Sequence, residues 1–190
     1  MLNRQIKYIK QYIQSPGEFG TVCPASKWLC QEMLSNINFD NVNIIAELGS
    51  ADGVFTKKIL SKVSKKTKLD AYEINEKFAS DLCFIAKSND NLSVFLSSAE
   101  LLKNRYDLIF SCLPFLSLPI KIRLKIINNI YDNLNVNGSF ILYQYTRNIE
   151  RILSEKFTFS RKLVLRNIPP AYVYVCKKNK FLNKNYASAE

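Results

Sequence analysis

Four residues in the first half of the chain are of types that could hold a nucleoside. Glu47, Gly49 and Gly53 lie in the stretch AELGSADGVFTKKIL (46–60), directly after a short apolar run, and Glu73 ends the next such run. Glycine lets the backbone approach a ligand closely. A carboxylate at the end of a second strand can accept two hydrogen bonds from a ribose. This pattern is typical of a ligand site, although a tight turn beside a solvated Glu73 would also produce it.

The same stretch argues against a phosphate site. The dinucleotide fingerprint GxGxxG would need glycine at positions 51 and 54, where the chain has Ala51 and Val54. A phosphate-binding loop would need GK[ST] at the start of the following helix, and the sequence has no such motif there. The ligand is therefore expected to be held by its nucleoside part.

Apolar runs and helical spacings alternate along the chain, which predicts a parallel sheet covered by helices on both faces. Pro169 and Pro170 separate the last two strands and favour an antiparallel hairpin. We expect one domain over residues 1–190, with a sheet core over 43–178 and a loose tail over 183–190. The expected strands are 43–48, 69–73, 92–96, 106–112, 138–146, 163–168 and 171–177, and the expected helices are 54–63, 75–87, 119–134 and 147–156.

Composition narrows the classes of function. The chain has no histidine and five cysteines without CxxC spacing, so we expect reduced, buried thiols and no metal site. No apolar run is long enough to cross a bilayer and no secretory signal is recognisable, so we expect a cytoplasmic protein. Its net charge of +11 favours a polyanionic partner, either nucleic acid or an anionic membrane surface.

The stretch 46–60 resembles motif I, ExGxGxG, of the class I S-adenosylmethionine-dependent methyltransferases, with Ala51 in place of the middle glycine. The resemblance implies a Rossmann-like, doubly wound, mostly parallel seven-stranded α/β sheet that ends in an antiparallel hairpin. It also implies S-adenosyl-L-methionine as the cofactor. Glu73 would hold the ribose, and the other contacts implied are Glu47, Gly49, Ser50, Ala51 and Gly53 at the methionine moiety and Ser98 and Ala99 at the adenine.

Three further segments resemble the bacterial phospholipid N-methyltransferases. These are GTVCPASKWLCQEM (20–33), SCLPFLSLP (111–119) and LRNIPPAYVY (165–174). The resemblance implies methylation of the phosphatidylethanolamine head-group amine at the membrane surface. One alternative is an rRNA adenine N6-methyltransferase, whose N-L-P-[YF] loop has asparagine where this chain has Cys112. A second alternative is an inactive methyltransferase fold that only binds a partner.

Under this resemblance the acceptor amine would lie between two segments. Gln144 and Tyr145 end the strand 138–146 and are both expected to take part in catalysis, with Tyr145 as the first choice to orient or deprotonate the amine. Pro114 and Phe115 lie in the loop 111–119, where the Phe115 ring could face an ammonium or simply pack in the core.

Two residues of the last hairpin, Arg166 and Asn167, suit a lipid phosphate, because a guanidinium and an amide both donate hydrogen bonds to anions. The same side chains could instead hold the hairpin backbone. We therefore expect either a phosphate contact or a structural role at this turn.

The N-terminal segment 1–35 is expected to contain an amphipathic helix that precedes and caps the site. Ile6 lies on an apolar stripe, and Lys7 and Lys10 flank it. Such a helix can lie in a membrane interface with its lysines on anionic head groups, or it can fold back on the core. We expect a monomer that associates peripherally with the inner membrane face.

Overall fold

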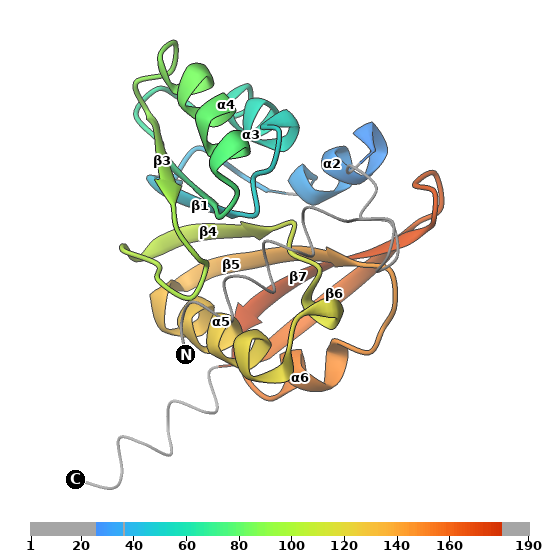
Figure 1. Ribbon diagram of the computed structural model, residues 1–190. Coiled ribbons are helices and arrows are strands. Elements are labelled where there is room, and N and C mark those ends of the chain that lie inside the picture. The colour runs from blue at the N-terminus through green and yellow to red at the C-terminus, as the bar shows by residue number, and fades with distance from the viewer. Residues whose placement is uncertain (1–25, 36, 180–190) are drawn as a thin grey trace, which may run out of the picture.

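The structure is a computed structural model that describes residues 26–35 and 37–179 (Figure 1). Within these residues the strands form one sheet in the order β3-β2-β1-β4-β5-β7-β6. The strands are β1 (Ile44–Leu48), β2 (Lys68–Glu73), β3 (Leu92–Leu96), β4 (Tyr106–Ser111), β5 (Leu134–Gln144), β6 (Phe157–Val164) and β7 (Ala171–Lys178). The helices are α2 (Lys27–Leu34), α3 (Val54–Leu60), α4 (Glu76–Ala86), the 3₁₀ helix η1 (Phe115–Ser117), α5 (Ile120–Asn133) and α6 (Glu150–Ser154).

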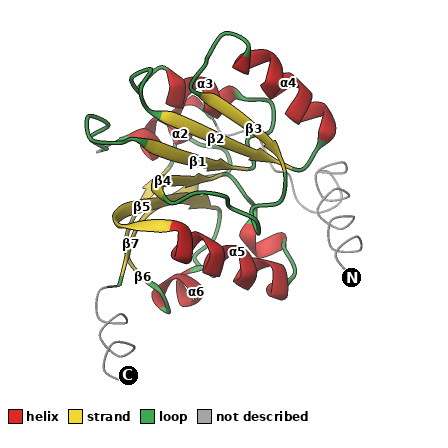
Figure 2. Ribbon diagram, turned by 90° about the vertical axis from the view of Figure 1, so that its left-hand side faces the viewer, coloured by secondary structure: helices red, strands yellow, loops and turns green. Residues whose placement is uncertain are grey.

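The sheet is parallel from β3 to β5, and β7 runs antiparallel to both β5 and β6. Helices cover both faces: α2, α3 and α4 lie on one side, and α5 and α6 on the other (Figure 2). The predicted doubly wound α/β sheet with a C-terminal antiparallel pair is confirmed.

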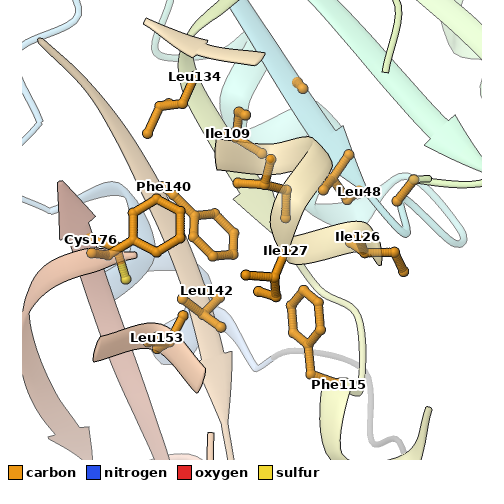
Figure 3. Close-up of a cluster of buried hydrophobic side chains, with 14 of the residues drawn as sticks. Leu48, Ile109, Phe115, Ile126, Ile127, Leu134, Phe140, Leu142, Leu153 and Cys176 are labelled. Atoms are coloured by element: carbon orange, nitrogen blue, oxygen red, sulfur yellow. The ribbon is translucent and has the colours of Figure 1, made fainter. Parts of the chain in front are cut away.

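A separate apolar core fills the space on each side of the sheet. Alternation along β1 sends Ala46 and Leu48 to the core under α5 and α6, and Ile45 to the core under α2 and α3. The first core also takes Phe140, Ile127 and other side chains that Figure 3 shows. The central strands have near-continuous apolar runs because both of their faces are covered.

The helix starts follow from local capping chemistry. The Ser26 side chain accepts a hydrogen bond from Leu29 N at the start of α2. The Asn75 side chain accepts from Lys77 N and Phe78 N at the start of α4. Both residues are of the types that satisfy the unpaired N–H groups of a helix N-terminus.

Two predicted boundaries in the C-terminal half were wrong. The fifth strand was expected to begin at 138, but β5 begins at Leu134, and its pairing with β4 is irregular between Leu134 and Ser139. The sixth strand covers 157–164, and not 163–168, because Phe157 and Phe159 of the earlier segment pack into the core. The apolar run 163–165 predicted the start of a buried strand, but Leu163 and Leu165 are exposed.

One cysteine also departs from expectation. Cys30 and Cys176 are buried and Cys112 is half-buried, but Cys83 is exposed on α4, so the prediction of uniformly buried thiols was wrong. Cys23, the predicted amphipathic segment with Ile6, Lys7 and Lys10, and the tail 183–190 lie outside the described residues. No helix among the residues described is long and apolar enough to cross a membrane.

The antiparallel pair places the last turn beside the carboxyl end of β5. Gln144 pairs with Tyr172 at the start of β7, while Phe140 pairs with Cys176. The turn between β6 and β7, residues 165–170, therefore lies at the sheet edge where the parallel strands end (Figure 1). In sheets of this type ligands bind at that edge.

Gly53 at the start of α3 offers a test of packing at this edge. Its φ is 76°, and a Cβ placed there would lie 2.5 Å from Ile85 Cδ1 of α4. We expect Gly53→Ala to lower the free energy of unfolding by roughly 1 to 3 kcal/mol, measured by urea denaturation, because backbone strain adds to the shift forced on the ends of Ile85 and Leu82. Ala51→Gly is the matched control, since Ala51 has a φ of 45°. It should leave stability unchanged or raise it by up to about 1 kcal/mol. Equal stability of Gly53→Ala and the unaltered chain would contradict the close α3–α4 contact.

Candidate active site

Backbone hydrogen bonds draw three strand ends together at the carboxyl edge of the sheet. Gly49 N and Ser50 N donate to Tyr72 O of β2, at 2.9 and 3.3 Å. Cys112 N, just after β4, donates to Leu48 O at the end of β1, at 2.9 Å. The loop after β1 is thereby fixed between its two neighbouring strands.

The loop 49–53 needs a left-handed backbone at three positions. Gly49 and Gly53 both have a φ of 76°, and Ala51 has a φ of 45°. Glycine adopts this region without strain, whereas alanine does so at a cost of about 1 kcal/mol. A Cβ at Gly49 would lie 2.8 Å from Leu113 Cδ2, so Gly49 also admits the loop after β4. The glycine pattern therefore serves both the turn and the approach of its neighbours.

Glu73 binds the backbone of this loop through its carboxylate. Oε2 accepts from Ala51 N at 2.9 Å, and Oε1 accepts from Ile74 N and Asn75 N at 2.8 Å each. The side chain is buried. A carboxylate offers about four lone-pair sites, so the Ala51 bond leaves Oε2 able to accept a further donor such as a ribose hydroxyl.

Glu47 is the most perturbed acid of the site. It is fully buried on the α3 side of β1, and Thr56 Oγ1 donates to its Oε2 at 2.6 Å. No donor among the described residues reaches its Oε1. Burial raises the pKa of the Glu47 carboxyl to about 8, against the opposing hydrogen bond from Thr56. A buried acceptor of this kind fits a ligand that brings an ammonium or another donor.

The predicted adenine segment forms a self-bonded turn after β3. Ser98 Oγ donates to Glu100 Oε2 and accepts from Glu100 N, each at 3.2 Å. Ala99 is buried, and its carbonyl accepts from Asn129 Nδ2 of α5 at 3.1 Å. The segment is thus held rigidly at the carboxyl edge, and its contact with an adenine stays a prediction.

Two side chains from other elements hold the loop 111–119. Gln144 Nε2, at the end of β5, donates to Leu113 O at 2.9 Å. Arg123 Nη2 of α5 donates to Leu116 O and Leu118 O at 3.0 Å each. Gln144 therefore positions the loop, a contact that the sequence did not predict for it.

Phe115 lies inside the core beneath this loop. It is fully buried, and its ring meets Phe140 edge-on at a centroid distance of 6.4 Å. Figure 3 shows the ring pointing toward Ile127 of α5. This placement corrects the expectation that the ring faces an ammonium and favours the packing role instead. Pro114, half-buried before it, accepts at its carbonyl from Ser117 N at 3.0 Å.

Tyr145 follows β5 at the edge of the candidate site. Its ring is half-buried and meets Tyr143 edge-on at a centroid distance of 5.9 Å, and its hydroxyl oxygen is buried. A tyrosine whose ring is partly exposed and whose hydroxyl is buried can orient a polar group that enters from the carboxyl edge of the sheet. Its contact with an acceptor stays a prediction.

Asn167 has a structural role that the sequence left open. Its Oδ1 accepts from Ser26 N at 3.3 Å, and its Nδ2 donates to Pro169 O at 2.7 Å. It is buried, so the amide joins α2 to the last turn and does not face a phosphate, which corrects that expectation. Arg166 is exposed, and its guanidinium lies over the Trp28 ring at 4.6 Å. The stacked guanidinium still carries donors for an anion.

Sequence reasoning missed three residues that shape this edge: Thr56, Arg123 and Trp28. Thr56 lies nine positions after Glu47, and a polar residue on the buried face of an amphipathic helix was the available signal. Arg123 lies three, four and seven positions before the buried Ile126, Ile127 and Ile130 of α5, so a cation on the apolar face of a helix was the available signal. Among residues 26–35 and 37–179, no group of three or more His, Cys, Asp or Glu side chains could hold a metal ion.

The raised pKa of Glu47 predicts a pH-dependent stability. In the fold the carboxyl keeps its proton up to about pH 8, whereas in the unfolded chain it ionises above its ordinary value of 4.5. The folded state therefore binds the extra proton between these values, and raising the pH through this window lowers stability. The slope is at most about 1.4 kcal/mol per pH unit. Because the chain has no histidine, few other side chains titrate there.

Urea unfolding at pH 5, 6, 7 and 8 measures this slope, and Glu47→Gln should remove it. A glutamine cannot ionise but keeps an oxygen that accepts from Thr56. The unaltered chain should lose stability relative to the variant as the pH rises. A constant difference between the two across the series would show that Glu47 ionises normally in the fold.

Comparisons with known proteins agree with this architecture. No protein-family model matches the chain. It is 24% identical over 186 residues to an ornithine lipid N-methyltransferase from Singulisphaera acidiphila, covering 90% of this chain and 94% of that one. The N-methyltransferase NodS from Bradyrhizobium japonicum, solved with S-adenosyl-L-homocysteine, superposes with a TM-score of 0.73 at 14% identity, covering 93% of this chain and 99% of that one.

An rRNA methylase from Streptococcus thermophilus also superposes, with a TM-score of 0.59 at 16% identity, covering 84% of this chain and 100% of that one. The fold is thus shared by methyltransferases whose names give different acceptors. The chain therefore has the fold of the class I S-adenosylmethionine-dependent methyltransferases, the fold that the resemblance of its sequence implied.

Proposed function

We propose that this chain is an S-adenosylmethionine-dependent N-methyltransferase that acts on the amine of a membrane lipid, with the phosphatidylethanolamine head group as acceptor. The observation that carries the proposal is the similarity to an ornithine lipid N-methyltransferase along 90% of the chain. Both lipids present a primary alkyl ammonium at a membrane surface. We place the reaction on the cytoplasmic face of the membrane, with the chain as a peripheral monomer.

The residues at the carboxyl edge fit S-adenosylmethionine. Glu47 offers a buried carboxyl oxygen that no described residue satisfies, which suits the cofactor's ammonium. Glu73 lies at the end of β2 with acceptor capacity for the ribose hydroxyls. The cofactor supplies a methyl group on a sulfonium, and the solved complex of NodS with S-adenosyl-L-homocysteine supports this choice.

On the acceptor side the protein must lower the barrier by placing and deprotonating an amine. A lysine-like amine has a pKa of about 10.4, so freeing its lone pair near pH 7 costs roughly 4 to 5 kcal/mol. With no histidine in the chain, we assign the orienting role to Tyr145 at the end of β5. Approach and alignment supply most of the remaining acceleration, because the transfer is an in-line displacement.

Methylation of an rRNA adenine is the second candidate. The fold alone does not separate the two, as the rRNA methylase superposition demonstrates. Cys112 favours the lipid reading, because a thiol is a poor acceptor for an adenine amino group and this position holds asparagine in the adenine loop. The relative that covers most of the chain points the same way.

The class of acceptor can be decided by methyl transfer with radiolabelled S-adenosylmethionine. The purified chain is offered vesicles with phosphatidylethanolamine, vesicles with an ornithine lipid, and 30S ribosomal subunits in separate reactions. We expect label in the phosphatidylethanolamine fraction. Label in the ornithine lipid alone would change the lipid acceptor, and label in RNA alone would overturn the lipid assignment.

Tyr145→Phe tests the proposed role of the hydroxyl. Turnover on the preferred lipid should fall by about 100-fold, with cofactor affinity by calorimetry nearly unchanged, because the hydroxyl acts on the amine. Tyr131→Phe is the control, since that ring packs on Phe157 on the α5 side of the sheet. If Tyr145→Phe keeps full turnover from pH 6 to 9, proton removal falls to water or to a carboxylate.

A further inference from the structure

The turn between β6 and β7 exposes large apolar side chains beside cations. Ile168 and Leu165 are 84% and 71% exposed at the tip of the turn, and Trp28 at the start of α2 is 36% exposed. Lys27 and Arg166 are exposed next to them. We name these five residues the hairpin surface. Three large apolar side chains gathered in one place on a soluble fold indicate an interaction surface.

Specific contacts join the two segments that carry the hairpin surface. Two cations contact the Trp28 ring, with Arg166 Cζ at 4.6 Å and Lys27 Nζ at 4.9 Å from its centroid. Asn167 joins the two segments, because its amide accepts from Ser26 N and donates to Pro169 O. The aliphatic side chains are therefore presented by a turn that is tied to α2.

The hairpin surface borders the acceptor side of the candidate active site. Tyr172, just after the turn, pairs with Gln144, and Gln144 in turn holds the loop 111–119 through Leu113 O. In Figure 1 the turn and α2 lie at the same end of the molecule as the carboxyl ends of β4 and β5. A partner that binds the hairpin surface therefore lies close to the carboxyl edge of the sheet.

The chemistry of the hairpin surface matches a bilayer interface. Tryptophan favours the boundary between head groups and acyl chains, aliphatic tips favour the acyl region, and lysine and arginine pair with anionic head groups. A nucleic acid backbone matches it less well, because phosphates recruit polar and cationic side chains and leave Leu165 and Ile168 facing water.

We propose that the hairpin surface docks on an anionic membrane, with Leu165 and Ile168 entering the interface and Trp28 lying at its boundary. This contact is distinct from the N-terminal stripe expected from the sequence. It deepens the proposed function by naming the surface that meets the membrane, and docking can be measured without methyl transfer.

Trp28 reports on this contact directly, since it is the only tryptophan of the chain. The full chain is mixed with vesicles of phosphatidylethanolamine and phosphatidylglycerol, with vesicles of phosphatidylcholine alone, and with a single-stranded RNA oligonucleotide. We expect a blue shift of tryptophan emission and quenching by brominated acyl chains with the anionic vesicles, and weaker effects with the neutral ones. Cosedimentation without any change in Trp28 emission would place the anchor elsewhere and overturn the proposal.

The variant Leu165→Ser with Ile168→Ser should lower partitioning onto anionic vesicles by about tenfold. Phe84→Ser is the matched control. Phe84 is 73% exposed beside Lys87, but it lies in the last turn of α4, which packs on β2 and β3 at the far side of the sheet from β6 and β7. It should partition like the unaltered chain. Equal losses in both variants, or binding of RNA without binding of vesicles, would overturn the proposal.

Methyl transfer to lipid dispersed in detergent separates docking from catalysis. The double variant should keep this activity, because its substitutions lie outside the cofactor and acceptor residues. If the unaltered chain docks but methylates no lipid, the proposed function fails and the docking surface stands. If the unaltered chain methylates dispersed lipid but vesicles never change the Trp28 emission, the docking surface fails and the proposed function stands.

Discussion

The carboxyl edge of the sheet depends on the hydrogen bonds that the Glu73 carboxylate accepts from backbone amides. It accepts the amide of Ala51 from the loop after β1 and the amides of Ile74 and Asn75 before α4. Charge-assisted bonds to backbone N–H groups are stronger than neutral ones, and burial strengthens them further. They hold the loop in a left-handed conformation that Ala51 adopts only with strain. One acid thus fixes the turn that must approach a ligand, while it keeps acceptor capacity for that ligand.

The loop after β4 is positioned by a different device, in which side chains from the next elements reach back to its carbonyls. Gln144 holds Leu113 O from β5, and Arg123 holds Leu116 O and Leu118 O from α5. Burial lowers the pKa of the Arg123 guanidinium, although it stays charged at neutral pH. Because one support comes from β5 and the other from α5, which packs on the same sheet, the loop after β4 is fixed relative to the central strands.

The periodicity of the sequence was sufficient for the architecture and for the backbone of the site. Strands covered on both faces give apolar runs in the sequence. Gly49 and Gly53 stood out because a left-handed backbone favours glycine, and Glu73 stood out because it ends the second of these runs. Phe115 and Asn167 could not be placed in this way. A ring in a loop can turn inward or outward, and an amide can bond a ligand or the chain's own backbone. These choices are made by neighbours distant in sequence, such as Phe140 and Ser26.

The absence of histidine shapes how the proposed reaction can meet its proton requirement. Without an imidazole, the environment itself must favour the neutral amine, and desolvation does so by lowering the pKa of an ammonium. The same effect is visible in Glu47, whose pKa burial raises to about 8. In the proposed reaction, an amine that moved from a membrane surface to the half-buried ring of Tyr145 would lose water along that path. Docking by the hairpin surface would shorten this path. Attachment to the membrane would then also remove water from the amine, which favours its deprotonation.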